Sequence, residues 1–215
     1  MAKAKKRKKF FPVNIPVINK EIQILGYSLE NLEGRQIKYD LTRVLRGKST
    51  ILNAKVRIKD DNAVAVPTKI KLMPYYLKRK IRKGTNYVED SFSTECKDAK
   101  IRIKPFLITR RKVSRAVRKT LRQKARKELQ EYAKSKNSEE IFKDVLQNDL
   151  QKPLSLKLKK TYPLSLCEIR VLKVEEFKDK KTSEKKKKNT KEQSKSKTTE
   201  KEPEKKTEKA KDAKE

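Results

Sequence analysis

Residues 52–59 read LNAKVRIK, and their strict alternation of apolar and polar side chains decides the fold class. Successive side chains of a β-strand point to opposite faces of a sheet, so a period of two predicts a strand with one buried and one solvated face. The apolar positions are Leu52, Ala54, Val56 and Ile58, and the polar positions are Asn53, Lys55, Arg57 and Lys59. This stretch therefore predicts a half-exposed strand.

The same alternation extends to both sides of this stretch. It recurs in Ile37, Tyr39 and Leu41, and further strands are predicted around residues 22–25, 64–66, 69–73, 86–88 and 101–108. Turn residues separate them, at Gly34, Gly47, Gly84 and the Asp60, Asp61, Asn62 cluster. Because no helical crossover long enough for a parallel sheet lies between these strands, they predict an antiparallel sheet curled into a barrel or sandwich.

The pattern changes to a helical period after the last of these strands. Residues 111–134 place apolar side chains along one stripe, at Val113, Val117, Leu121, Ala125 and Tyr132. A second helix is predicted to open at Asn137, where Glu140 can complete a capping box, and to bury Ile141, Phe142, Val145 and Leu146. Pro153 prevents this helix from continuing. A short strand is predicted at Leu154, Leu156 and Leu158. A last strand is predicted at Ile169, Val171 and Val174.

These elements predict an α+β protein with an antiparallel β-barrel-like core, a long basic helix, a second helix and a C-terminal strand. The 215 residues carry 61 Lys and Arg against 28 Asp and Glu, for a net charge of +33, and only 34% are hydrophobic. Residues 1–9 are predicted to form a disordered basic arm, and residues 178–215 a disordered Lys/Glu-rich tail, because neither can bury enough apolar surface to offset its ordering entropy. A single domain is predicted over residues 10–177.

The charge of that domain indicates a polyanionic partner. The arm and the tail contribute +6 and +7, so residues 10–177 keep +20. A compact body with this much unbalanced charge repels itself unless a polyanion neutralises it. Nucleic acid fits, since its phosphates release condensed counterions when Lys and Arg bind.

The helix at 111–134 carries the most specific basic feature. At 100° per residue six cations fall within an arc of roughly 100°, opposite the apolar stripe; they are Arg111, Arg115, Arg118, Lys119, Arg122 and Arg126. The alternative is a basic helix face that is only solvated. Solvated helix faces usually also carry acidic residues, which form ion pairs with basic residues four positions away. Glu128 and Glu131 are the only acids between Arg110 and Lys136. We therefore predict RNA or DNA contact by this face.

Other basic residues are less specific. Two further clusters are either RNA-facing or solvated. One lies in a loop or strand end and contains Lys78, Arg79, Lys80, Arg82 and Lys83. The other precedes a turn and contains Lys157, Lys159 and Lys160. The arm residues Lys5, Lys6, Arg7, Lys8 and Lys9 are predicted to enter RNA crevices and order on binding. Tyr75, Tyr76 and Tyr87 could stack on unpaired bases, but packing in the sheet is the preferred interpretation. Recognition by phosphate and shape is expected.

Catalysis, metal binding and membrane insertion find no support in the sequence. It has no His, the commonest general base and metal ligand, and Asp60 and Asp61 are interpreted as a turn and not as a magnesium site. Cys96 and Cys167 have no CxxC spacing and are predicted to be reduced core residues. No apolar run approaches the ~18–20 residues of a membrane span, and the N-terminal residues lack the apolar region of a signal peptide. We expect a cytoplasmic protein with no enzymatic activity, cofactor, metal, membrane partner or small-molecule substrate.

Three motifs occur in a fixed order along the chain. They are LEGR at 32–35 before an alternating strand, the helix entry with Ser114, Ala116, Leu121 and Arg122, and YPL at 162–164 followed by Ile169 and Arg170. Their order and spacing over residues 18–176 are similar to the archaeal and eukaryotic small-subunit ribosomal proteins called S-three-A, or eS-one. The short connections between strands, and the lack of the His that eukaryotic members carry in the basic helix, indicate an archaeal member. The tail differs, so no role is transferred to it.

The resemblance implies a location and partners. It implies a structural constituent of the small subunit, on its platform near the messenger exit, contacting small-subunit ribosomal RNA and neighbouring platform proteins, with messenger RNA as a further candidate partner. Arg35, Ser114, Arg122 and Arg170 match the family pattern, and Ser114 has a helix-start role as its alternative. The expected RNA-binding residues also include Arg79, Arg82, the helix cations and the arm. The competing hypothesis is a non-ribosomal RNA- or DNA-binding protein of the chromatin type.

Overall fold

The stretch at residues 52–59 forms most of a central strand, β4 (Thr50–Lys59), in the computed structural model, which describes residues 7–59 and 62–177. Leu52 and Val56 are fully buried and Ala54 is nearly so, whereas Lys55 and Arg57 are exposed. The alternation thus specifies which face of β4 enters the core, as predicted. β4 pairs antiparallel with β3 (Gln36–Asp40) and β5 (Asn62–Leu72).

The described residues form a nine-stranded mixed sheet that does not close into a barrel. One path through the sheet runs β2-β1-β5-β9-β8-β6, with β3 and β4 branching from β5 and β7 from β8. The remaining strands are β1 (Lys9–Ile15), β2 (Lys20–Gly26), β6 (Tyr87–Glu89), β7 (Phe92–Glu95), β8 (Ala99–Thr109) and β9 (Leu164–Phe177). The α+β class is confirmed, but the barrel-like core is wrong. Both β1 and β9 pair with β5. The strands at the two ends of the path, β2 and β6, do not pair with each other, so the described sheet stays open.

Two local pairings differ from a simple antiparallel sheet. β1 runs parallel to β5 where Val13 and Asn14 meet Ala63 and Val64. The strands predicted separately at 64–66 and 69–73 are one strand, β5, which continues through Pro67. The register against β4 shifts between Asn53 and Ala54, beside Pro67. Proline has no backbone N–H to donate to the neighbouring strand. The hydrogen-bond ladder is already interrupted at a bulge, so the missing donor does not end the strand.

The helical part contains two elements that sequence patterns misassigned. The basic cluster that begins at Lys78 was expected in a loop or strand end, but Lys78, Arg79 and Lys80 form the last turn of α1 (Pro74–Lys80), which has proline in its first turn. The strand predicted at Leu154, Leu156 and Leu158 is instead helix α4 (Gln151–Lys159). Leu154 and Leu158 are four residues apart and buried on one helix face, whereas Leu156 is 68% exposed. Pro153 is tolerated because the first turn of a helix leaves its N–H groups unpaired.

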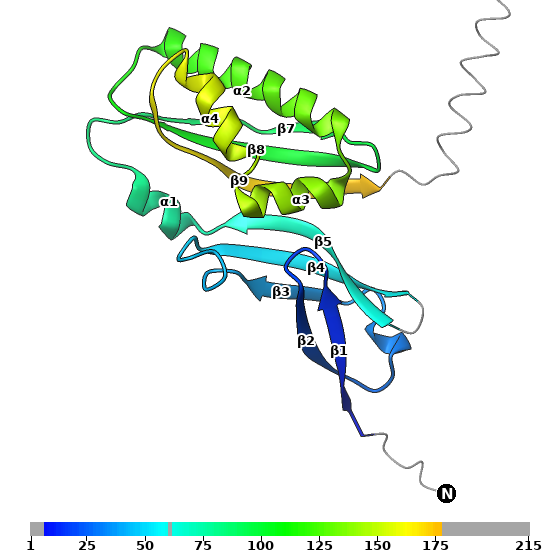
Figure 1. The fold of residues 1–215 in the computed structure, drawn as a ribbon. Coiled ribbons are helices and arrows are strands. Elements are labelled where there is room, and N and C mark those ends of the chain that lie inside the picture. Colours follow the sequence, from blue (N-terminus) through cyan, green and yellow to red (C-terminus); the bar gives the residue numbers. More distant parts are fainter. Residues whose placement is uncertain (1–6, 60–61, 178–215) are drawn as a thin grey trace, which may run out of the picture. The chain divides into compact units, whose positions relative to one another are not determined.

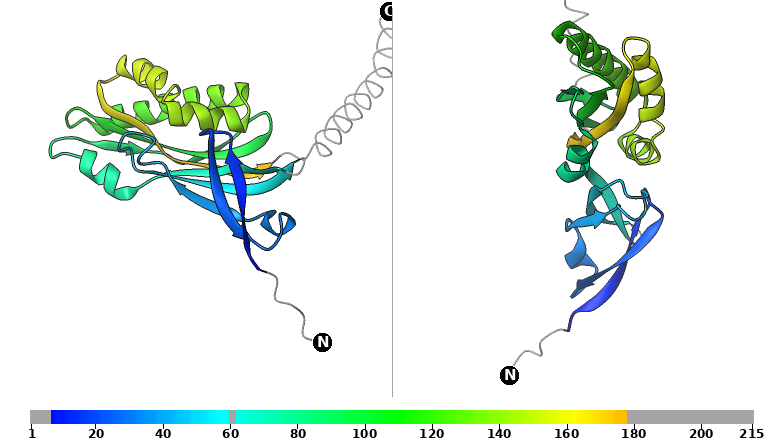
Figure 2. Two further views of the ribbon diagram at one scale, coloured as in Figure 1. Left: turned by 60° about the horizontal axis from the view of Figure 1, so that its bottom comes forward. Right: turned by 90° about the vertical axis from the view of Figure 1, so that its left-hand side faces the viewer.

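Three helices pack against the sheet, one against β6 and β7, one against β5 and β9, and one against β9 (Figure 1). They are α2 (Arg115–Ser135), α3 (Ser138–Gln147) and α4, and α3 has the predicted capping box between Asn137 and Glu140. Figure 2 shows α3 and α4 on the same side of β9 in two further views. No helix among the described residues has both the length and the apolar character needed to cross a bilayer.

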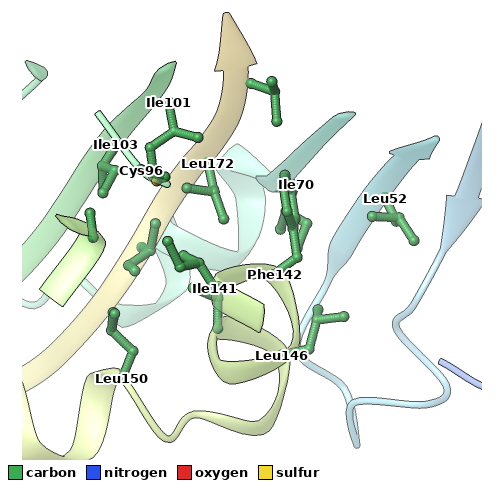
Figure 3. Close-up of a cluster of buried hydrophobic side chains, with 14 of the residues drawn as sticks. Leu52, Ile70, Cys96, Ile101, Ile103, Ile141, Phe142, Leu146, Leu150 and Leu172 are labelled. Atoms are coloured by element: carbon green, nitrogen blue, oxygen red, sulfur yellow. The ribbon is translucent and has the colours of Figure 1, made fainter. Parts of the chain in front are cut away.

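The core lies between these helices and the sheet (Figure 3). Ile70, Leu172 and Ile103 stand side by side on β5, β9 and β8, and each is at most 1% exposed. Ile141 and Phe142 of α3 belong to the same buried cluster as this row. Each such large apolar side chain contributes about 1.5–3 kcal/mol by leaving water. This contact holds α3 to the sheet.

The cysteines offer a test of this packing. Cys96 is 3% exposed and Cys167 is half-buried on β9. Burial raises the pKa of the Cys167 thiol to about 12, whereas an unfolded cysteine has a pKa of about 8.5. Because only the thiolate reacts, alkylation of Cys167 at pH 8 should be roughly a thousandfold slower in the folded protein than in denaturant. Time-resolved iodoacetamide labelling measures this, and equal rates would contradict the packing of β9.

Candidate nucleic-acid interface

The basic helix begins later than its sequence pattern predicted. The side chain of Ser114 accepts a hydrogen bond from the Val117 backbone N–H and caps α2, so Ser114 has the helix-start role that was its alternative. Arg111 lies before the cap, where its carbonyl accepts a hydrogen bond from the Thr109 hydroxyl at 2.8 Å. Five of the six predicted cations therefore belong to the helix: Arg115, Arg118, Lys119, Arg122 and Arg126.

These five cations lie beside the buried stripe of α2, and the prediction that they lie opposite it is wrong. The buried residues of α2 are Leu121, Ala125, Leu129 and Ala133. Next to them, Arg122 Nε donates to the carbonyl oxygen of Glu89 on β6 at 3.1 Å. The Arg126 guanidinium lies 5.3 Å from the centre of the buried Phe92 ring on β7. These contacts hold the guanidinium groups of Arg122 and Arg126 against the sheet edge, and both side chains remain exposed.

A hollow opens along the first turns of α2. Its volume is about 730 Å³ and it is lined by Tyr87, Arg115, Ala116, Arg118, Lys119 and Arg122. Tyr87 is 54% exposed and stacks on Phe106, with ring centroids 5.9 Å apart and 19° between the planes. The preferred expectation was that the three tyrosines pack in the sheet, but Tyr75 and Tyr76 lie on α1, where Tyr76 packs against a buried cluster that includes Phe106 and Ile108 of β8. Tyr75 and Tyr87 are exposed.

Two nearby carboxylates, those of Glu89 and Glu128, are engaged by other cations. Arg170 Nη1 donates to both carboxylate oxygens of Glu89, at 3.0 and 2.9 Å. Arg170 is the extra residue of a β-bulge, since Lys104 pairs with Val171 and Pro105 with Ile169, and bulges redirect side chains in this way. On α2 itself, Glu128 pairs with Lys157 at 2.5 Å.

The five α2 cations consequently have no carboxylate within 4.0 Å in the part of the chain that the structure describes. Arg115 and Lys119, and likewise Arg118 and Arg122, are like charges at i,i+4, which destabilise a helix by a few tenths of a kcal/mol per pair. An anion in the hollow would relieve this repulsion. Guanidinium groups suit phosphate, because they donate two parallel hydrogen bonds and stay charged.

The remaining predicted residues do not line this hollow. Arg35 donates to the Leu25 carbonyl at 2.8 Å, Arg79 lies 5.4 Å from the centre of the Tyr75 ring on α1, and Arg82 is exposed after α1. In the arm, Arg7 and Lys8 precede β1 and Lys9 begins it, so Lys9 is part of a strand. The described residues do not include Lys5, Lys6, the tail or the predicted turn at Asp60 and Asp61.

Sequence patterns did not identify Glu89 as part of this site. Glu89 joins α2 to β9, because its carbonyl accepts from Arg122 and its carboxylate from Arg170. Its role depends on the pairing of β6 with β8, which brings Glu89 opposite Phe106. No periodicity in the sequence signals that pairing, since β6 has only three residues.

Two comparisons with known proteins bear on identity. No curated protein matches the chain. The model of the Ribosomal S3Ae family matches residues 2–178, which is most of the 215-residue chain and includes all of its described elements. This match confirms the family resemblance expected from the three motifs. The chain belongs to the Ribosomal S3Ae family, and so to a family of small-subunit ribosomal proteins and not of enzymes.

Proposed function

We propose that this chain is a structural constituent of the small ribosomal subunit that binds small-subunit ribosomal RNA by phosphate and shape contacts. The observation that carries the proposal is the hollow of about 730 Å³ along α2, whose cations have no carboxylate partner among the described residues. Family membership supplies the context of the small subunit. The cations supply the chemistry, because neutralising phosphates releases condensed counterions and gives strong, salt-dependent binding.

Phosphate recognition fits the hollow better than base reading. Its lining includes four cations and one aromatic ring, Tyr87. Folds that read single-stranded RNA by stacking use organised aromatic side chains on adjacent strands. Here the ring next to Tyr87 is Phe106, which is 2% exposed and unavailable to a base. The RNA is therefore held by its backbone and shape.

Other residues extend this contact in the proposal. Arg170 is held by Glu89 beside Arg122, where the three link β9, β6 and α2. The arm from Lys5 to Lys9 reaches RNA from the start of β1, and Arg35, Arg79, Arg82 and Arg111 make peripheral contacts. Residues 10–177 act as the RNA-binding domain, between the basic arm at 1–9 and the tail at 178–215.

The family resemblance extends the proposal to a position on the ribosome. We place the chain on the platform near the messenger exit, beside neighbouring platform proteins and within reach of messenger RNA, in the cytoplasm. The short strand connections and the basic helix without His support an archaeal origin.

Sedimentation tests the proposed function. We expect the tagged full chain to migrate with the small subunit in sucrose gradients at moderate salt, and to prefer structured RNA over duplex DNA in competition at matched salt. A chain found only in the soluble top fractions would contradict the ribosomal proposal. A preference for duplex DNA would instead support the chromatin-type alternative.

A further inference from the structure

A second cationic surface lies on the face of β5, β9 and β8 opposite Ile70, Leu172 and Ile103. Strand register aligns it in rows. Lys69 on β5 pairs with Lys173 on β9, which pairs with Arg102 on β8. In the next row on this face, Lys71 and Lys104 flank Val171. Because successive side chains point to opposite faces, these cations project away from the apolar row that α3 covers.

Most of these cations lack a counter-charge. Arg102 pairs with Glu175 at 2.7 Å. Lys69, Lys71, Lys104 and Lys173 have no carboxylate within 4.0 Å among the residues that the structure describes. Like charges directly opposite on neighbouring strands destabilise a sheet. The pairing of Lys69 with Lys173, and of Lys173 with Arg102, thus has an unfavourable energy that a bound polyanion would remove.

This face is hollowed and reaches α2. A hollow of about 760 Å³ is lined by Lys69, Lys71, Glu89, Asp90, Ser91, Arg102, Lys104, Pro105, Arg122, Arg170, Val171 and Lys173. Arg122 also lines the hollow along α2, so one side chain borders both. The gap between β6, which ends at Glu89, and β7, which begins at Phe92, is where Arg122 meets the sheet face. The two cationic surfaces are therefore continuous.

The dimensions and chemistry fit a nucleic-acid backbone. Strands lie about 4.8 Å apart, so the cations span roughly 10 Å across three strands, and residues two apart on a strand are separated by roughly 7 Å. No aromatic residue lines this hollow, so it offers no ring on which a base could stack, and its cations favour contact with a phosphate backbone. Long lysine side chains can follow a backbone whose phosphates are not rigidly placed, because each ammonium is a point charge on a flexible stem.

We infer that this sheet face is a second phosphate-binding surface, and that one RNA backbone passes from the α2 hollow by Arg122 onto β8, β9 and β5. The inference rests on the proposed RNA-binding function and extends it to residues outside the basic helix. It assigns Lys69, Lys71, Lys104 and Lys173 to the contact, with Arg122 as the point where the two surfaces join.

Salt-dependent binding of the full chain to a structured small-subunit rRNA fragment tests the inference. One variant replaces Lys69, Lys71, Lys104 and Lys173 by Gln. Since each phosphate contact contributes about 0.7–0.9 to the slope of log affinity against log salt, we expect the slope to fall by about 3 and the affinity to fall roughly 10- to 100-fold at 0.15 M salt. The matched control replaces four exposed lysines of the helical layer by Gln, at positions Lys127, Lys134, Lys143 and Lys159, and should bind almost as wild type.

The outcomes separate this inference from the proposed function. If the α2 variant Arg115→Glu, Arg118→Glu, Arg122→Glu loses affinity while the sheet variant binds as wild type, the sheet inference is overturned and the proposed function stands. If neither variant changes affinity, both fail. Two RNA molecules bound per chain would overturn a single continuous backbone. A sheet variant that binds RNA normally but does not enter the small subunit would assign this face to an acidic protein, and would also overturn the inference.

Discussion

Replacing Arg115, Arg118 and Arg122 by Glu is expected to weaken binding to small-subunit rRNA by roughly 10³-fold or more at physiological salt. Each arginine loses a charge-assisted hydrogen bond of about 1.5–3 kcal/mol and gains a repulsive charge. Three lost phosphate contacts should also lower the slope of log affinity against log salt by about 2–3. Filter binding or fluorescence anisotropy across a salt series measures both quantities.

A matched variant controls for total charge. Lys127, Lys134 and Lys143 are exposed lysines of α2 and α3 that line neither of the two hollows described above. Their replacement by Glu changes the net charge by the same amount, and should reduce affinity less than tenfold. Circular dichroism confirms that both variants fold. Equal losses in the two variants would mean that net charge, and not the α2 hollow, determines binding.

Replacing Phe142 by Ala is expected to lower the free energy of unfolding by about 3–5 kcal/mol, which is typical of a buried phenylalanine. Phe142 is 1% exposed and packs with its α3 neighbours against the row formed by Ile70 and Leu172. Domains of this size are stable by only about 5–15 kcal/mol, so the loss is a large fraction of the total. Urea denaturation followed by circular dichroism measures it.

The adjacent Lys143 provides the control for this experiment. It lies on the exposed side of α3, so Lys143→Ala should change the free energy of unfolding by no more than about 0.5 kcal/mol. A loss below about 1 kcal/mol for Phe142→Ala would show that α3 does not cover the sheet as described.

Sequence patterns predicted the elements whose periodicity is long and unambiguous. β4, the body of α2 and the capping box of α3 were all predicted correctly, because alternation and capping are local properties. Leu154, Leu156 and Leu158 were misassigned, because residues two apart suggest a strand while Leu154 and Leu158 also share one helix face. β1 and β7 were missed, since β1 contains Pro12 and follows the basic arm, and β7 has four residues.

The candidate interface was predictable only where it lies on one element. The α2 cations follow from helical geometry, whereas Arg111 was misplaced because the cap at Ser114 was only one of two interpretations. The sheet cations are spread over three strands that are far apart in sequence. Their alignment depends on the registers of β5, β9 and β8, which include bulges that no local pattern reveals.

The closure of the sheet was mispredicted for a related reason. Short alternating strands are equally compatible with a closed barrel and with an open sheet covered by helices. The difference lies in how much apolar surface the helices contribute. α3 and α4 bury Ile141, Phe142, Leu154 and Leu158 against the sheet, and so they supply the core that a barrel would otherwise enclose.

A density map of an assembled small subunit that contains this chain tests the RNA contact most directly. We expect rRNA phosphate oxygens within about 2.7–3.2 Å of the guanidinium groups of Arg115, Arg118 and Arg122, which is hydrogen-bond distance. Basic side chains of α2 that face solvent, or that pack against another protein, would contradict the proposed function.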